Sequence, residues 1–165
     1  MQEKVTAMWN SPKGQAEYRV LRTKSMIIQA ESQKQAIEFA ERTGFRMSII
    51  SITSKEEANV SFPENPNIAS ILHLKFNDLT EEYDEEGIPY GRPLPQPDDF
   101  VGLKAFVAEL ACDILLVHCR EGKSRSAAVA TAIYEYRGKK DRLLIKRDAW
   151  PNPLVYMLVC RELGI

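Results

Sequence analysis

Residues 115–126 of this chain are Leu-Leu-Val-His-Cys-Arg-Glu-Gly-Lys-Ser-Arg-Ser. The pattern indicates a short apolar strand, a tight turn with one glycine, and a helix that continues into the small-residue run 127–130. In such a turn successive backbone N–H groups point inward, and the helix end adds partial positive charge. The stretch therefore predicts a strand–turn–helix unit with an anion site at the turn.

Apolar strands alternate with helices on both sides of this unit. The pattern predicts strands at 25–30, 45–53, 68–76 and 113–118. Helices are expected at 32–44, from 97 onward, at 125–137, from 141 onward and at 152–163. Such alternation predicts an α/β fold, a single domain with a central, largely parallel sheet flanked by helices on both faces.

Capping residues mark two of these helices. Ser32 with Gln35 three residues later has the capping-box pattern, and Asn152 before Pro153 is typical of a helix start. Capping alone explains Asn152. Residues 1–24 are mixed and polar, so we interpret them as a leader or an edge segment that precedes a domain at 25–165.

Composition limits the classes of partner. The net charge of −1 gives no argument for nucleic acid, and no apolar run is long enough for a membrane span or a signal peptide. The three cysteines are widely scattered, which favours a reducing, cytoplasmic location over a disulfide framework. The two histidines form no zinc-like spacing with cysteine, so we expect neither a metal nor another cofactor.

The chemistry of the turn rests on Cys119 and Arg125. A helix N-terminus lowers the pKa of a nearby thiol, which would make Cys119 a thiolate nucleophile. Arg125 carries a planar fork of donors that matches two oxygens of a phosphoryl group. A buried cysteine beside a solvated basic turn is the simpler alternative. A nucleotide-binding loop is excluded, because Val117 stands where its first glycine is needed.

The pattern His-Cys, five residues, Arg-Ser resembles the signature loop of the cysteine-dependent protein tyrosine phosphatase superfamily, and it looks most like the dual-specificity phosphatases. The resemblance implies a phosphomonoester hydrolase that forms a cysteinyl-phosphate intermediate on Cys119. It also implies that Arg125 binds the phosphate, that His118 organises the loop, and that the Ser126 hydroxyl helps the thiolate leave. The substrate phosphate would be bound by the whole loop: Cys119, Arg120, Glu121, Gly122, Lys123, Ser124 and Arg125.

A phosphatase of this kind needs a carboxylic acid that protonates the departing oxygen. Asp78 is the first candidate, because Asn77-Asp78 follows a strand and is similar to the segment that carries the general acid in dual-specificity phosphatases. Its separation from Cys119 is longer than is usual in that family. Three further aspartates therefore remain alternatives: Asp84, Asp98 and Asp99.

The substrate is expected to be a phosphorylated protein or a small phosphoester, with three alternatives for the chain's activity. A protein tyrosine or dual-specificity phosphatase is the first. Because Lys123 adds a second cation beside Arg120, the loop also resembles those of inositol phosphate and phosphoinositide phosphatases. A phospho-binding module without turnover is the third. The sequence does not decide the oligomeric state, and a protective disulfide between Cys119 and Cys112 or Cys160 is a further hypothesis.

Overall fold

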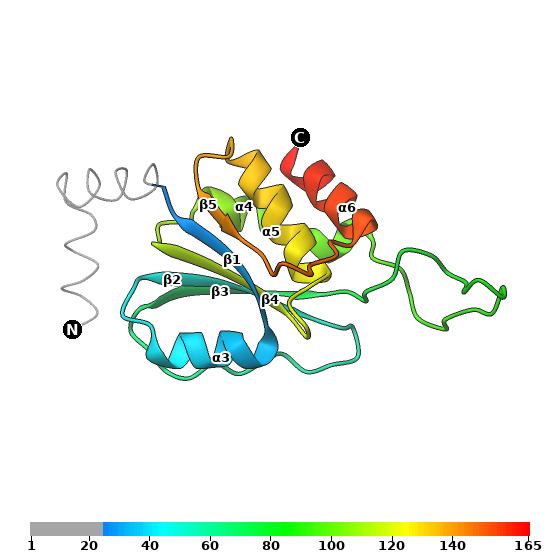
Figure 1. The fold of residues 1–165 in the computed structure, drawn as a ribbon, viewed down its shortest axis with the longest axis horizontal. Coiled ribbons are helices and arrows are strands. Elements are labelled where there is room, and N and C mark those ends of the chain that lie inside the picture. The colour runs from blue at the N-terminus through cyan, green and yellow to red at the C-terminus, as the bar shows by residue number, and fades with distance from the viewer. Residues whose placement is uncertain (1–24) are drawn as a thin grey trace.

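The computed structural model describes residues 25–165, and the segment predicted as a leader, 1–24, lies outside them. Five parallel strands form one sheet in the order β3-β2-β4-β1-β5 (Figure 1). The strands are β1 (Ile27–Ser32), β2 (Met47–Thr53), β3 (Ile68–Lys75), β4 (Ile114–Cys119) and β5 (Arg142–Leu144). The predicted fold class, a single α/β domain with a parallel sheet, is therefore confirmed.

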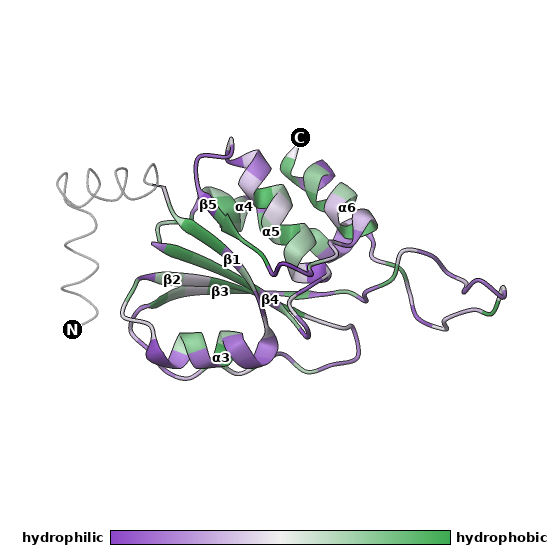
Figure 2. Ribbon diagram, in the orientation of Figure 1, coloured by the Kyte–Doolittle hydropathy of each residue, from purple (hydrophilic) through white to green (hydrophobic). Residues whose placement is uncertain are grey.

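Helices cover both faces of the sheet, as expected. One face carries α3 (Gln33–Arg42), and the other carries α4 (Leu103–Ala108), α5 (Arg125–Tyr136) and α6 (Pro153–Leu163), with the 3-10 helix η1 (Pro97–Phe100) beside them (Figure 1). The larger core lies under α5 and α6, and a smaller one lies under α3. Figure 2 shows the matching pattern, with hydrophobic residues along β1 and β4 and hydrophilic residues on much of α3.

The two predicted caps are present. The Ser32 hydroxyl accepts a hydrogen bond from the backbone N–H of Gln35 at 3.3 Å, and α3 begins at the next residue. The Asn152 side chain accepts from the backbone N–H of Val155 at 3.1 Å, with Pro153 as the first residue of α6. These local signals therefore fix where both helices start.

The helix predicted from Asp141 onward is wrong, because Arg142–Leu144 forms β5 and pairs with β1 at the edge of the sheet. The Asp141 carboxylate is buried, forms an ion pair with Arg137 and accepts from the backbone N–H of Met26 at 2.9 Å. These contacts dock the start of β5 against β1. A run of three residues is too short for its periodicity to separate a strand from a helix.

The helix predicted from 97 onward is present in two pieces. η1 ends at Phe100, and α4 begins only at Leu103. Gly102 between them has φ 91°, a left-handed conformation that interrupts helical geometry. Residues 97–108 therefore do not form one continuous helix.

A long connection, residues 77–96, extends beyond the carboxyl ends of the strands (Figure 1). Its middle forms a narrow hairpin, in which Tyr83 and Pro89 form an antiparallel bridge. The Asn77 side chain anchors the base of the connection by donating to the Pro93 carbonyl at 3.0 Å.

Between residues 25 and 165, no helix has the length and apolar character that crossing a bilayer requires.

Candidate active site

The sulfur of Cys119 lies inside the turn that joins β4 to α5. The backbone N–H of Gly122 donates to Sγ at 3.3 Å, and the Ser126 hydroxyl lies 3.2 Å from it. Cys119 is buried, and Ser126 belongs to the first turn of α5. Negative charge on this sulfur would therefore face a backbone donor, a hydroxyl and the positive end of a helix.

Gly122 lets the turn pack tightly against the end of β1. Its φ is 72°, and a Cβ atom at this position would lie 2.3 Å from the backbone carbon of Glu31. The neighbouring Arg120 carbonyl accepts from the backbone N–H of Gln33 at 3.2 Å, which joins the turn to the start of α3. The requirement for glycine at this position thus has two causes, the backbone conformation and the lack of space.

Arg125 is buried at the start of α5 and faces the ends of β2 and β3. Its Nη1 donates to the Phe76 carbonyl at 3.0 Å and to the Ser54 hydroxyl at 3.1 Å. Its Nε is buried and has no hydrogen-bond partner among the described residues. A buried cationic donor without a partner is unfavourable, so an oxyanion bound at the turn would stabilise this side chain.

Asp78 is joined directly to the turn. Its Oδ1 accepts from the Ser124 hydroxyl at 2.7 Å and from Asn152 Nδ2 at 2.8 Å. The carboxylate follows β3, whose carboxyl end lies at the same edge of the sheet as that of β4. The structure thus brings together the aspartate and the cysteine-containing turn that the sequence pattern selected.

The three alternative aspartates have other surroundings. Asp84 accepts from the backbone N–H groups of Glu86 and Ile88 within the hairpin, at 3.1 and 2.7 Å. Asp99 pairs with Lys55 at 2.9 Å, and Asp98 is exposed in η1. Within residues 25–165, Asp78 is the one aspartate of the four whose carboxylate is hydrogen-bonded to the turn.

His118 is a buried member of β4. Its Nε2 lies 2.7 Å from the Ser51 hydroxyl, its Nδ1 lies 3.4 Å from the Cys119 carbonyl, and the Phe62 ring meets it edge-on. Burial lowers the pKa of His118 from 6.5 to about 4, so the imidazole is neutral near pH 7. A neutral ring between β2 and the Cys119 backbone can hold the start of the turn, as the resemblance implies.

The two cations of the turn both face carboxylates. Lys123 Nζ lies 2.6 Å from Asp148 Oδ2, and this partner raises the pKa of Lys123. Arg120 Nη1 lies 3.9 Å from Glu57 Oε1. The backbone carbonyl of Glu121, between them, accepts from Lys146. Since both pairs are exposed, they hold the side chains weakly.

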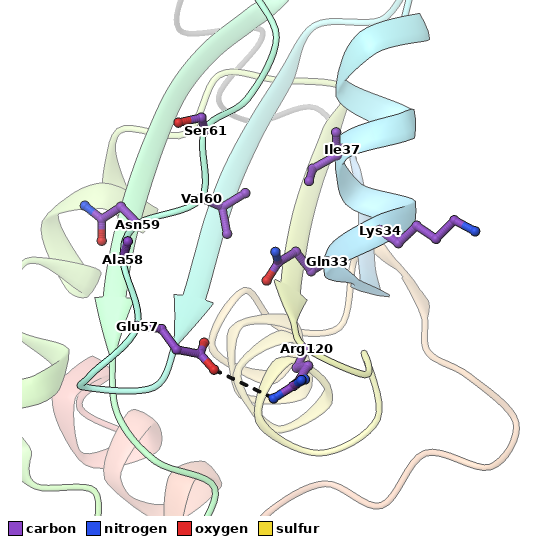
Figure 3. A pocket seen from close by; sticks show the side chains of 9 residues that line it. All are labelled: Gln33, Lys34, Ile37, Glu57, Ala58, Asn59, Val60, Ser61 and Arg120. Atoms are coloured by element: carbon purple, nitrogen blue, oxygen red, sulfur yellow. Dashed lines mark ion pairs between the residues drawn. The ribbon is translucent and has the colours of Figure 1, made fainter.

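A groove of about 770 Å³ begins beside Arg120. Figure 3 shows Arg120 and Glu57 facing each other at one end, with Ile37 from α3 and Val60 from the segment after β2 further along. Lys34 adds a second cation to the lining. A separate cleft of about 440 Å³ lies at Asp78 and Ser124.

Asn152 contacts Asp78, and the sequence analysis did not predict this contact. Besides capping α6, its Nδ2 donates to Asp78 Oδ1 and to the Leu79 carbonyl, at 2.8 and 3.2 Å. Its backbone N–H donates to the Ser124 carbonyl at 3.3 Å. The segment 150–153 therefore links the aspartate, the turn and α6, which capping alone did not suggest.

The other two cysteines, Cys112 and Cys160, lie outside the turn that holds Cys119. Cys112 is buried just before β4, and burial raises the pKa of its thiol. Cys112 precedes β4 and Cys119 ends it, and the strand alone spans about 16 Å at about 3.3 Å per residue. A disulfide between Cys112 and Cys119 is therefore incompatible with this fold. Cys160 is a free, half-buried thiol on α6.

Comparison with known proteins adds no relative to this description. No protein-family model and no curated protein matches the chain.

Proposed function

We propose that the protein is a cysteine-dependent phosphomonoester hydrolase, in first place a protein tyrosine or dual-specificity phosphatase. The observation that carries this proposal is the sulfur of Cys119, which faces the Gly122 N–H at 3.3 Å and the Ser126 hydroxyl at 3.2 Å. Arg125, with a buried Nε that lacks a partner among the described residues, supplies the cation for a phosphoryl group. Asp78, bound to the same turn through Ser124, supplies the acid.

In the first step, the Cys119 thiolate attacks phosphorus and a sulfur–phosphorus bond forms. The bond between phosphorus and the ester oxygen breaks, and Asp78 transfers its proton to that oxygen. Arg125 and the N–H groups of the turn stabilise the charge on the equatorial oxygens.

In the second step, water attacks the phosphocysteine while the Asp78 carboxylate accepts a proton from it. The sulfur–phosphorus bond breaks, inorganic phosphate leaves, and the thiolate is regenerated. The Ser126 hydroxyl can donate to the departing sulfur, because it already lies within hydrogen-bond distance of Sγ. No cofactor is needed for either step.

The test is turnover of 4-nitrophenyl phosphate. Wild-type protein should hydrolyse it and be inhibited by vanadate, an analogue of the phosphoryl group in transfer. Cys119→Ser should abolish turnover and retain phosphate-ester binding, because the serine hydroxyl is a far weaker nucleophile at neutral pH. Cys160→Ser is the matched control, since Cys160 lies on α6 outside the site, and it should keep wild-type activity.

A second candidate is an inositol phosphate or phosphoinositide phosphatase. It is favoured by the exposed cations Arg120 and Lys123 at the turn and by Lys34 in the groove beside them. The ion pairs with Glu57 and Asp148 weaken that support, because they offset part of the positive charge. Parallel assays with phosphotyrosine peptides and an inositol phosphate panel separate the two candidates.

The third alternative, a phospho-binding module, predicts binding without turnover. A stable complex of phosphate ester with wild-type protein and no released phosphate would establish it. The presence of Cys119, Arg125 and Asp78 around one turn favours the enzyme.

A further inference from the structure

The cleft of about 440 Å³ beside the turn has two exposed aromatic residues in its lining. Its lining includes Asp78, Ser124, Trp150, Tyr90 and Arg92. Its volume lies within the range of small-ligand sites. Trp150 is 81% exposed and Tyr90 is 46% exposed, so neither residue belongs to the hydrophobic core.

Both aromatic residues are held by their backbones rather than by their rings. The backbone N–H of Trp150 donates to the Lys123 carbonyl at 2.8 Å, which ties this residue to the turn. The backbone N–H of Tyr90 donates to the Glu82 carbonyl at 3.0 Å within the hairpin. The rings are thus kept near Asp78 but free to contact a ligand.

We infer that this cleft receives the leaving group of the substrate, and that Trp150 and Tyr90 determine specificity for an aromatic one, the tyrosyl side chain of a phosphopeptide. The inference rests on the proposed function. Because Asp78 protonates the departing oxygen, the group attached to that oxygen must lie on the side of Asp78, which is where the cleft is. Aromatic rings there can stack on a phenyl ring.

The charges of the cleft favour the same ligand. Arg92 is its one cationic side chain, Asp78 is its one carboxylate, and no ion pair of Arg92 is found within residues 25–165. A leaving group with several phosphates would need a cluster of cations, whereas a neutral ring does not. Arg92 then remains available to a carboxylate next to the phosphotyrosine.

The experiment compares kcat/KM for phosphotyrosine and phosphoserine in one peptide sequence. In Trp150→Ala the ratio of the two should fall about three- to tenfold, which matches the value of one aromatic contact. Trp150→Phe should recover most of the ratio, and Tyr90→Ala should lower it independently. Tyr83→Ala is the matched control, because Tyr83 is an exposed tyrosine of the same hairpin outside the cleft lining, and it should leave the ratio unchanged.

A second measurement separates binding from chemistry. In a Cys119→Ser background, calorimetry should show weaker binding of the phosphotyrosine peptide when Trp150→Ala is added. Equal loss for both peptides, or no change in either measurement, would overturn the inference. So would an inositol phosphate that outcompetes the phosphotyrosine peptide.

The failure of this inference is distinguishable from failure of the proposed function. If wild-type protein hydrolyses no phosphomonoester, the proposed function is wrong and the inference is overturned with it. If wild-type protein is active but the ratio is insensitive to Trp150 and Tyr90, the phosphatase remains and only the assignment of the cleft is wrong.

Discussion

At the scale of single residues, Gly122 is a tightly constrained position in the turn between β4 and α5. Two independent constraints act there, a φ of 72° and the backbone of Glu31 and Ser32 against the missing side chain. Neither neighbour is the flexible end of a side chain. A residue with a Cβ atom must therefore move the turn or the end of β1.

We expect Gly122→Ala to lower the free energy of unfolding by about 2–4 kcal/mol, since it adds backbone strain and overpacking. Turnover of 4-nitrophenyl phosphate should fall as well, because the Gly122 N–H faces the sulfur. Gly138→Ala is the matched control, with φ 75° and no atom within 4 Å of an added Cβ. Equal urea midpoints for the two variants would contradict the role of close packing.

In the proposed mechanism Asp78 protonates the leaving group, and Asn152 donates a hydrogen bond to its carboxylate. We expect Asp78→Asn to slow hydrolysis of phenyl phosphate at mildly acidic pH by about 100-fold or more, because a general acid contributes on this order. The loss should be much smaller for 2,4-dinitrophenyl phosphate, whose leaving group needs no proton. A loss below about threefold with phenyl phosphate would exclude Asp78 as the acid.

The same two substrates, phenyl phosphate and 2,4-dinitrophenyl phosphate, test whether Asn152 positions Asp78 in addition to capping α6. Asn152→Ser keeps a side chain that caps α6 well, but it removes the amide that donates to Asp78 Oδ1. We expect a lower kcat with phenyl phosphate, an unchanged KM, and little change with 2,4-dinitrophenyl phosphate. An equal loss with both substrates would indicate a purely structural role.

At the scale of elements, the site is assembled by the common direction of the strands. Ser54 follows β2, Asp78 follows β3, and Cys119 ends β4, so three segments far apart in sequence meet at one edge of the sheet. Parallel strands bring their carboxyl ends to one edge, so Cys119 and Asp78 could be expected there together, whereas the choice of Asp78 over Asp84, Asp98 and Asp99 also used the family resemblance and stays a prediction.

Other features depend on contacts that no local pattern contains. The edge strand β5 has three residues, and its identity depends on pairing with β1 and on the buried Asp141. Asn152 satisfies its local capping pattern, which concealed its second contact with Asp78. A sequence pattern describes neighbours along the chain, whereas these contacts join segments far apart.

The hairpin within the connection 77–96 is an element that the core does not require. Tyr83 and Ile88 are 52% and 60% exposed, and Asn77 anchors the connection at its base through Pro93. We expect replacement of residues 82–90 by a short Gly/Ser linker to change the free energy of unfolding by less than about 1 kcal/mol, because shortening a loop is inexpensive. Urea unfolding measures this.

The same variant should lose selectivity, since it lacks Tyr90 and therefore one wall of the cleft at Asp78. The phosphotyrosine-to-phosphoserine ratio should fall while the protein remains folded. A loss of several kcal/mol in unfolding free energy would instead show that the hairpin belongs to the cooperative core.

At the scale of the whole molecule, the layers of helices on both faces of the sheet determine the charge of the buried His118. Both faces of β4 are covered by helices, so its histidine is surrounded by protein rather than by water. The pKa of His118 is lowered to about 4, chiefly by burial, with smaller contributions from His73 and Arg125. The folded state therefore holds this ring neutral over a pH range in which the unfolded chain protonates it.

Between pH 6.5 and about 4 the unfolded state binds the extra proton, so the stability contributed by neutral His118 is fully present above pH 6.5 and is lost as pH falls toward 4. We expect the free energy of unfolding to drop by about 2 kcal/mol between about pH 7.5 and about pH 5 from this one group. His118→Gln, which is uncharged at both pH values, should remove most of this slope in urea titrations. His73→Gln is the control, because His73 is exposed and its lowered pKa should contribute less. If the His118→Gln protein keeps the wild-type slope, acidic residues rather than the buried ring control the acid sensitivity of this fold.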